Sequence, residues 1–242
     1  MTQNIYDQDN FFAGYSRLRR SQEGLAGAPE WASLQAMLPD MTDKRVLDLG
    51  CGFGWFCRWA REHHGAAEVL GIDVSEKMLA RARVTTSDPA IGYARGDMET
   101  LTLARDSYDL VYSSLAFHYI ADLARLFGEI HASLAPGGAF VFSVEHPLYT
   151  APSEPGWTES GGRKTWPLDS YLKEGPRRTD WLAKDVLKYH RSLSTYLNTL
   201  LATGFTLRYI EEWGPTDAQL AANPALAEER DRPTFLLVSA RR

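Results

Sequence analysis

Three glycines at alternate positions give this sequence its clearest chemical signal. The apolar run Val46-Leu47-Asp48-Leu49 leads directly into Gly50-Cys51-Gly52-Phe53-Gly54. Glycines let a backbone turn sharply and approach a ligand closely, here just before a predicted helix whose N-terminal N–H groups favour anions. The dinucleotide fingerprint G-x-G-x-x-G requires glycine at position 55, where this chain has Trp55. The loop therefore predicts a nucleotide-like ligand and argues against an NAD(P)-dependent oxidoreductase, which stays the less favoured alternative.

Two carboxylates follow the loop at positions suited to an adenosyl ligand. Asp73 ends the next apolar run, 25 positions after Asp48, where a carboxylate can accept hydrogen bonds from both ribose hydroxyls. In Gly96-Asp97-Met98, the carboxylate can accept the adenine amino group while the thioether covers the ring. Two simpler alternatives remain open, since Asp73 can cap the following helix and Asp97 can be a turn residue.

These motifs in this order resemble those of the class I S-adenosylmethionine-dependent methyltransferases. The resemblance rests on V-L-D-L-G-C-G-F-G, I-D-V-S-E-K-M-L, G-D-M-E and L-A-P-G-G-A-F-V, and covers roughly residues 40–145 plus the last two strands. Within that class it points to the ubiquinone-biosynthesis-like enzymes, which act on small molecules. It implies S-adenosyl-L-methionine as cofactor and a small-molecule methyl acceptor. A non-catalytic S-adenosylmethionine-binding module stays open as an alternative.

The resemblance also implies which residues meet the methionine part of the cofactor. Gly50, Gly52 and the backbone of Cys51 would face it, while Asp48 would fix the loop and the amino group. N-terminal arms often cover the cofactor in related enzymes, and an arginine can pair with a carboxylate through two hydrogen bonds. We therefore expect Tyr15 and Arg20 to cover this end of the site.

The other implied contacts surround the adenosine. Asp73 would hold the ribose, with Val74 and Met78 flanking the adenine; a place in the core is the alternative for Met78. Asp97 and Met98 would complete the adenine pocket. After the fourth strand, two further residues would meet the cofactor through their backbone, namely Ser114 and Leu115.

The acceptor side is less defined, because a methyl group on a sulfonium is already activated. A general base is needed only when the acceptor must lose a proton. Four residues are candidates for it: His118, Glu145 and His146 where strands four and five end, and His190 near the end of an insertion. The alternatives are that His118 packs under the sheet edge and that His190 caps a helix.

Alternating strands and helices must position these residues. The predicted strands are 45–49, 68–73, 91–94, 108–113, 139–144, 205–212 and 234–240, with helices at 54–64, after Ser75, at 122–134 and near 192–203. Such βα units predict an α/β, Rossmann-like, doubly wound, mostly parallel seven-stranded sheet. Ligands bind such sheets outside the carboxyl ends of the strands. The resemblance implies that the last two strands form an antiparallel hairpin.

Two further segments complete the predicted organisation. Residues 1–43 form an N-terminal helical cap, and residues 44–146 with 191–242 form the cofactor-binding domain. Residues 147–190, rich in proline, glycine and aromatic side chains, are too long for a plain connection and are interpreted as an inserted acceptor-site lid. The alternative role for their aromatic residues is an oligomer contact, as in a homodimer.

Composition narrows the function classes. The chain has 242 residues, 44% of them hydrophobic, and a formal net charge of -5. Nucleic-acid enzymes usually carry a basic stripe, and only short basic clusters occur here, so no nucleic acid is expected as a partner. The two cysteines lack metal-ligand spacing, which predicts no metal site. Without a signal-peptide or membrane-spanning pattern, a cytoplasmic protein without membrane attachment is expected.

Overall fold

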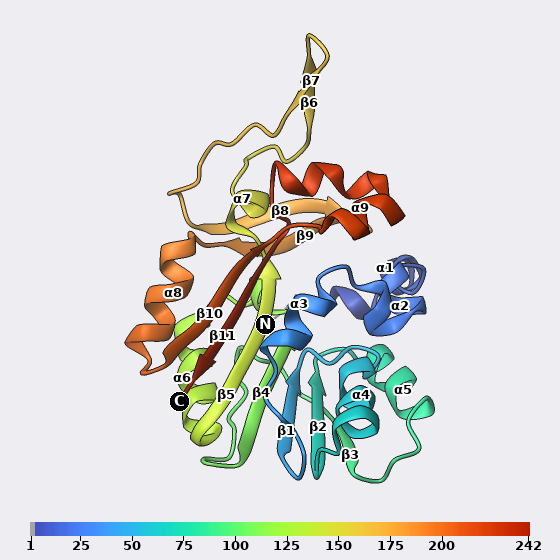
Figure 1. Ribbon diagram of the computed structural model, residues 1–242, viewed down its shortest axis with the longest axis vertical. Helices are drawn as coiled ribbons and strands as arrows, with labels where there is room; N and C mark the ends of the chain where they lie inside the picture. The colour runs from blue at the N-terminus through green and yellow to red at the C-terminus, as the bar shows by residue number, and fades with distance from the viewer. Residues whose placement is uncertain (1–2) are drawn as a thin grey trace.

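The computed structural model describes residues 3–242, and its centre is a seven-stranded sheet with helices on both faces (Figure 1). The strands are β1 (Arg45–Leu49), β2 (Glu68–Asp73), β3 (Ile91–Arg95), β4 (Tyr108–Ser114), β5 (Leu134–Glu145), β10 (Thr206–Trp213) and β11 (Phe235–Arg241). Their order across the sheet is β10-β11-β5-β4-β1-β2-β3. All neighbours from β1 to β5 pair in parallel, whereas β11 runs antiparallel to β5 and β10. The predicted Rossmann-like sheet with its C-terminal antiparallel pair is confirmed.

Side chains of the central strands alternate between two buried clusters, as a sheet covered on both faces requires. On β4, Val111 faces one cluster, while Leu110 and Tyr112 face the other. The first cluster includes side chains of α6 (Leu123–Ser133) and α8 (Leu193–Ala202). The second includes side chains of α3 (Trp31–Met37), α4 (Trp55–His64) and α5 (Glu76–Val84). The sheet is therefore packed between two helical layers, and the glycine loop after β1 leads directly into α4 of the second layer.

Strand β5 begins five residues earlier than its apolar run predicts. Helix α6 ends at Ser133, and Leu134 already pairs with Tyr108 of β4. The next paired residue of β5 on this side is Ala139, so the intervening Pro136-Gly137-Gly138 forms a bulge within the strand. Proline and glycine mark a turn in a sequence, but here the strand resumes after them.

The segments outside the sheet lie beside the carboxyl ends of its parallel strands. The N-terminal part contains η1 (Ile5–Asp7), α1 (Asp9–Tyr15), α2 (Arg19–Gln22) and η2 (Gly24–Gly27), before α3. The insertion contains α7 (Pro147–Thr150) and two hairpins, β6 (Thr158–Ser160) with β7 (Arg163–Thr165), and β8 (Gly175–Trp181) with β9 (Ala183–His190). Phe11 of α1 packs edge-to-face on Trp181 of β8, with ring centroids 5.5 Å apart. The two segments thus close over the sheet together.

Two features of the chain were not apparent from the sequence. Helices α9 (Asp217–Ala222) and η4 (Pro224–Arg230) fill the connection between β10 and β11. The β6–β7 hairpin extends away from the body of the molecule, at the top of Figure 1. Both regions are rich in polar residues, which give little hydrophobic periodicity to read.

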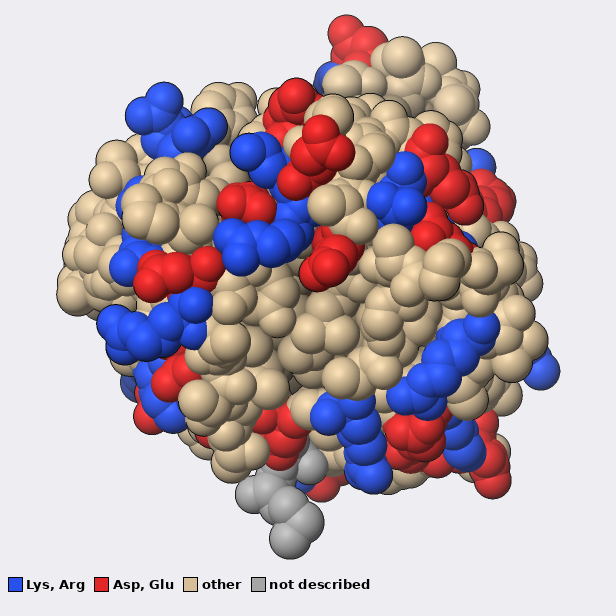
Figure 2. All heavy atoms as spheres, turned by 90° about the horizontal axis from the view of Figure 1, so that it is seen from below, with Lys and Arg blue, Asp and Glu red and all other residues tan. Residues whose placement is uncertain are grey.

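The exposed surface mixes both signs of charge. On the face shown in Figure 2, acidic and basic side chains are interspersed around an uncharged centre. A surface that follows a phosphate backbone would instead align its cations. Within residues 3–242, no helix combines the length and apolar character that crossing a membrane requires.

The glycine loop between β1 and α4 depends on left-handed backbone. Gly50, Gly52 and Gly54 have φ angles of 75°, 51° and 71°, which residues with a Cβ rarely adopt. A Cβ at Gly54 would also lie 2.1 Å from the Tyr93 hydroxyl, whereas a Cβ at Gly52 would meet nothing within 4 Å. A Cβ at Gly50 would lie 2.6 Å from the Cβ of Ala116, so the loop needs glycine for two reasons, conformation at all three positions and space at Gly50 and Gly54.

A pair of substitutions separates these two reasons. Gly54→Ala should lower the free energy of unfolding by about 1–3 kcal/mol more than Gly65→Ala, because only the first adds an overpacked contact. Gly65 is the matched control, since its φ of 59° is also left-handed and its Cβ would meet nothing within 4 Å. Urea unfolding of both variants measures the difference. Equal destabilisation would show that Tyr93 moves aside freely and does not constrain the loop.

Candidate active site

A cavity of about 250 Å³ lies beyond the carboxyl ends of the parallel strands, the place where open α/β sheets bind ligands. Most residues predicted for the site line this cavity. From the cofactor group these are Tyr15, Arg20, Gly50, Gly52, Asp73, Val74, Met78, Asp97, Met98, Ser114 and Leu115, and from the catalytic group His118 and Glu145. The structure therefore brings together side chains from the ends of β1 to β5 and from the N-terminal segment.

A smaller cavity of about 90 Å³ adjoins the first one on the side of the N-terminal helices. It is lined by Asp48 and Cys51, the two predicted cofactor residues that do not line the larger cavity. The two cavities share lining residues, namely Tyr15, Arg20, Gly50, Gly52 and Ser114. They form one elongated site with the glycine loop at its middle.

Asp73 fixes this loop through hydrogen bonds at both carboxylate oxygens. Its Oδ2 accepts the backbone N–H of Gly52 at 2.9 Å, and its Oδ1 accepts the N–H of Ser75 at 2.9 Å. Burial raises the pKa of Asp73, although these two N–H groups oppose the shift. Each carboxylate oxygen can accept a second hydrogen bond, so binding a ligand hydroxyl does not require the loop contacts to break.

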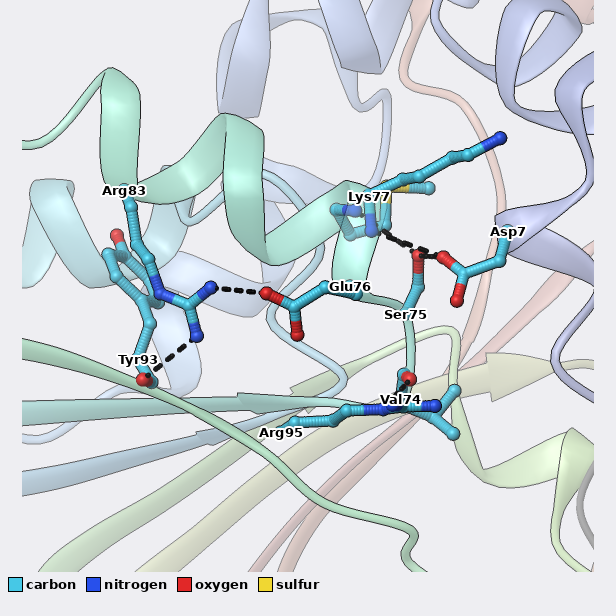
Figure 3. Close-up of polar contacts among 9 residues, drawn as sticks. Asp7, Val74, Ser75, Glu76, Lys77, Arg83, Tyr93 and Arg95 are labelled. Atoms are coloured by element: carbon cyan, nitrogen blue, oxygen red, sulfur yellow. Dashed lines mark hydrogen bonds and ion pairs between the residues drawn. The ribbon is translucent and has the colours of Figure 1, made fainter.

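The turn after Asp73 is held from two sides (Figure 3). Asp7 of the N-terminal segment accepts the Ser75 hydroxyl at 2.6 Å and the Lys77 N–H at 3.1 Å. Partial burial opposes ionisation of Asp7, but these hydrogen bonds lower its pKa below the usual value. From the sheet, Arg95 Nε donates to the Val74 carbonyl at 3.1 Å. Val74 is thereby fixed in the cavity wall, and Ser75 caps α5 as predicted.

The smaller cavity gathers ionisable groups that are hidden from solvent. Burial raises the pKa of Asp48 to about 7, with the Cys57 thiol donating to its Oδ2 at 3.4 Å. Glu30 is fully buried and accepts Arg20 Nη2 at 2.8 and 3.0 Å. Ser21 Oγ is buried here without a hydrogen-bond partner. Buried carboxylates can bind an ammonium, and a guanidinium and a hydroxyl can bind a carboxylate. The lining of this cavity therefore suits an amino acid group, which carries both charges.

Glu30 and Ser21 were not predicted as site residues. Neither belongs to a motif, and Glu30 lies ten residues from Arg20, with the end of α2 and all of η2 between them. A buried carboxylate needs a partner of opposite charge. Because Arg20 was expected in the site, a nearby glutamate that pairs with it was the one feature that could have been predicted. The pairing itself follows from how α2, η2 and α3 fold back on the glycine loop.

Aromatic side chains surround the other end of the larger cavity. Tyr6 of η1 donates to the hydroxyl of Tyr119, in η3 (Phe117–Tyr119), at 3.3 Å. Tyr149 and Trp181 of the insertion and Phe235 of β11 also line this cavity. The insertion was predicted to contribute aromatic residues here, whereas the role of Tyr6 was missed. Four segments distant in sequence thus form one aromatic wall.

His118 is a neutral imidazole in this wall. It is buried in η3, and its Nδ1 accepts the Glu145 N–H at 3.4 Å. Burial lowers the pKa of His118 to about 4, despite the opposing charge of Glu145. His118 therefore carries no charge at neutral pH. It both lines the cavity and is buried, and its catalytic role stays a prediction.

Two predicted catalytic histidines do not line the larger cavity. His146 is the N-cap of α7: its Nδ1 accepts the Leu148 N–H, and its Nε2 lies 2.9 Å from Glu212. His190 is fully buried at the end of β9, with Nδ1 2.8 Å from the Thr150 hydroxyl and Nε2 2.8 Å from the Tyr171 carbonyl. Both ring nitrogens of each histidine are thus used. His146 joins the start of the insertion to β10, and His190 joins three parts of the insertion to one another.

Arg232 joins the insertion to the connection before β11. Its guanidinium lies 4.6 Å from the ring centroid of Tyr149, 5.6 Å from Trp157 and 4.4 Å from Trp166. Its Nη2 donates to Glu229 and Thr234, each at 3.1 Å, whereas Nε and Nη1 are buried without hydrogen-bond partners. Three aromatic rings therefore surround this cation and stabilise it through cation–π contacts. One of them, Tyr149, also lines the larger cavity, so the cluster adjoins the site.

Comparison with known proteins decides the family of this site. Residues 47–142, which include the glycine loop and Asp73, match the family described as Methyltransferase domain. The crystal structure of an S-adenosylmethionine-dependent methyltransferase from Mesorhizobium loti is 62% identical, with a TM-score of 0.87, over 90% of this chain and 100% of that one. The chain belongs to the S-adenosylmethionine-dependent methyltransferases.

Other relatives of this methyltransferase show how far the likeness extends. An uncharacterized protein of Haemophilus influenzae is 32% identical over 99% of this chain and 97% of its own length. A malonyl-[acyl-carrier protein] O-methyltransferase of Pectobacterium atrosepticum is 38% identical over 46% of this chain and 42% of its own length. The predicted class, enzyme type and cofactor are confirmed, which rules out the oxidoreductase alternative. Membership of the ubiquinone-biosynthesis-like group stays a prediction.

The contacts of Arg232 with Tyr149, Trp157 and Trp166, here called the Arg232 cluster, are expected to hold the insertion of this methyltransferase in place. Arg232→Met should speed chymotrypsin cleavage after Trp157 about 5- to 30-fold, since losing about 1–2 kcal/mol of cation–π attraction makes local opening more frequent. Arg230→Met is the matched control, because Arg230 pairs with the exposed Asp217 outside the cluster. Mass spectrometry of timed digests gives the rates. Cleavage as slow as in the control would show that Arg232 does not hold the insertion.

Proposed function

We propose that this methyltransferase binds S-adenosyl-L-methionine along the two adjoining cavities and methylates a small-molecule acceptor enclosed by its N-terminal segment and its insertion. The observation that carries the proposal is the enclosure itself. The larger cavity is lined both by Tyr6 and Tyr15 from the N-terminal segment and by Tyr149 and Trp181 from the insertion. A cavity of about 250 Å³ between these segments suits a small acceptor better than a folded macromolecule.

The adenosine part of the cofactor would occupy the larger cavity. Each carboxylate oxygen of Asp73 accepts one backbone N–H, and its remaining lone pairs would accept the ribose hydroxyls. The adenine would be enclosed by Val74, Met78, Asp97 and Met98. The open space beside Gly52 would admit the chain that joins the ribose to the amino acid group.

The amino acid group would occupy the smaller cavity. Asp48, which titrates near neutrality, would ionise against the ammonium, and Arg20 would face the carboxylate. Cys51 would contribute its backbone beside Gly50, while Ser114 and Leu115 would meet the cofactor after β4. Leu115 has a left-handed φ of 54° and donates its N–H to the Ser143 carbonyl at 2.9 Å, which fixes the backbone of this segment.

The segments outside the sheet would enclose the methyl acceptor. Residues 1–43 would act as a cap, residues 147–190 as a lid, and residues 44–146 with 191–242 as the cofactor-binding domain. The cofactor supplies an activated methyl group, so the protein needs mainly to align the acceptor with it and to exclude water. The aromatic wall excludes water, and the hydrogen bonds of Asp7 and Asp73 keep the loop and the turn after it in place.

Calorimetric titration with S-adenosylmethionine and S-adenosylhomocysteine tests the proposal. We expect binding of both ligands, weakened at least tenfold (about 1.4 kcal/mol) by Asp73→Ala, because the ribose hydroxyls lose their acceptor. The control is Asp217→Ala, whose carboxylate is 93% exposed and paired with Arg230. Unchanged affinity in Asp73→Ala would refute the assigned cofactor position, and absence of binding to the unaltered protein would refute the proposal as a whole.

A further inference from the structure

Glu145 and Lys188 form a buried ion pair at the acceptor end of the larger cavity. Glu145 is the last residue of β5, and its Oε1 accepts Lys188 Nζ at 2.5 Å. Only 13% of the Glu145 side chain and 4% of the Lys188 side chain are exposed. Glu145 lines the cavity, whereas Lys188 of β9 lies behind it, with Nζ 5.2 Å from the Trp181 ring centroid. Burying two charges is costly, so the pair needs a reason beyond stability.

The second carboxylate oxygen of Glu145 points to that reason. Oε2 is buried and has no hydrogen-bond partner. Buried polar atoms are nearly always satisfied, so an unpartnered oxygen on a side chain that lines the cavity indicates a group that the ligand completes. Two donors next to this carboxylate are already used, since Lys188 Nζ contacts Oε1 and the Glu145 N–H reaches His118 Nδ1. The missing partner must therefore bring its own hydrogen.

The charges around the cavity exclude an anionic partner at this position. Among the described residues that line it, Asp73, Asp97 and Glu145 are acidic, and Arg20 is the one lysine or arginine. Arg20 is paired with Glu30, and His118 is neutral at neutral pH. A carboxylate placed against Glu145 would meet a like charge, and the side chains that line the cavity offer no unpaired cation to balance it. A neutral O–H or N–H group meets no such penalty.

We infer that Glu145 Oε2 binds the reacting group of the methyl acceptor, that this group is a neutral hydroxyl or amine, and that Lys188 positions the carboxylate for it. The inference rests on the proposed function and narrows its acceptor class. The aromatic wall of Tyr6, Tyr119 and Trp181 favours an acceptor whose hydroxyl or amine is carried on a planar, apolar body.

Glu145 also receives the proton that the reaction releases. As the acceptor oxygen or nitrogen forms its bond to the methyl carbon and the carbon–sulfur bond breaks, the acceptor proton moves to Oε2. The positive charge of the sulfonium and the negative charge of the carboxylate are cancelled together, which leaves a neutral methylated acceptor, a thioether and a carboxylic acid. The acid then returns its proton to water.

Four ring compounds of similar size test the inference on the protein saturated with S-adenosylhomocysteine. Phenol offers a neutral O–H, aniline a neutral N–H, anisole no donor and benzoate a negative charge. Ligand-observed NMR titration should show phenol or aniline binding at least tenfold more tightly than benzoate and more tightly than anisole. Whichever of phenol and aniline binds better shows whether the carboxylate prefers an O–H or an N–H donor.

Variants then assign the preference to the ion pair. Glu145→Gln should reduce the ratio of phenol (or aniline) to benzoate affinity at least fivefold, whereas the control Glu212→Gln, outside the cavity, should leave it unchanged. If Glu145→Gln fails to fold, Glu145→Gln combined with Lys188→Met removes both charges and should give the same loss. Lys188→Met should weaken the binding of phenol (or aniline) and Lys188→Arg should restore it, which a purely structural lysine would not do.

The outcomes are distinct from those of the cofactor test. Benzoate binding as tightly as phenol and aniline, no saturable binding of either donor, or a ratio insensitive to Glu145→Gln would overturn the inference while S-adenosylhomocysteine still binds. Failure of S-adenosylhomocysteine to bind the unaltered protein would instead overturn the proposed function beneath it.

Discussion

The hydrogen bonds of the Asp73 carboxylate are the constraint on which the rest of the site depends. One oxygen holds the N–H of Gly52 in the loop after β1, and the other holds the N–H of Ser75 at the start of α5. Two neighbouring strands are thereby joined at their carboxyl ends through a single side chain. The loop can make this contact because Gly50, Gly52 and Gly54 all adopt left-handed backbone. Its own hydrogen bonds then leave lone pairs of the same carboxylate for a ligand.

Paired charges extend this arrangement outward from the loop. Arg20 with Glu30 lies toward the smaller cavity, and Lys188 with Glu145 lies toward the aromatic wall. Lys188 of the insertion pairs with Glu145 of β5 and so ties the insertion to the sheet. Arg20 and Glu30 both belong to the N-terminal segment, so their pair fixes the fold of that segment beside the glycine loop. Breaking a buried pair by removing one partner typically costs about 3–5 kcal/mol. The charged groups of the N-terminal segment and of the insertion thus lie in or directly behind the walls of the two cavities.

The sequence predicted the parts of this protein that are local in the chain. The strands around the glycine loop, the Ser75 cap and the positions of Asp73 and Asp97 follow from short motifs and periodicity. Lys188 could not be found in this way, because it meets Glu145 across 43 residues and through a hairpin whose register the sequence does not reveal.

Side-chain direction was equally hard to predict. His146 follows directly after Glu145, yet Pro147 begins α7 there, so the imidazole caps that helix rather than entering the cavity. Glu30 shows the reverse case, because a glutamate without any motif becomes a fully buried partner of Arg20. Strand ends thus predict where a site lies, whereas the turns after them decide which side chains reach it.

A crystal structure of the protein with S-adenosylhomocysteine would test the central claim most directly. The account predicts both ribose hydroxyls within hydrogen-bond distance of Asp73 and the amino acid group in the smaller cavity near Asp48 and Arg20. It also predicts the thioether sulfur on the side of the larger cavity that leads to Glu145. A ligand whose ribose lies away from Asp73, or whose sulfur faces away from Glu145, would contradict it.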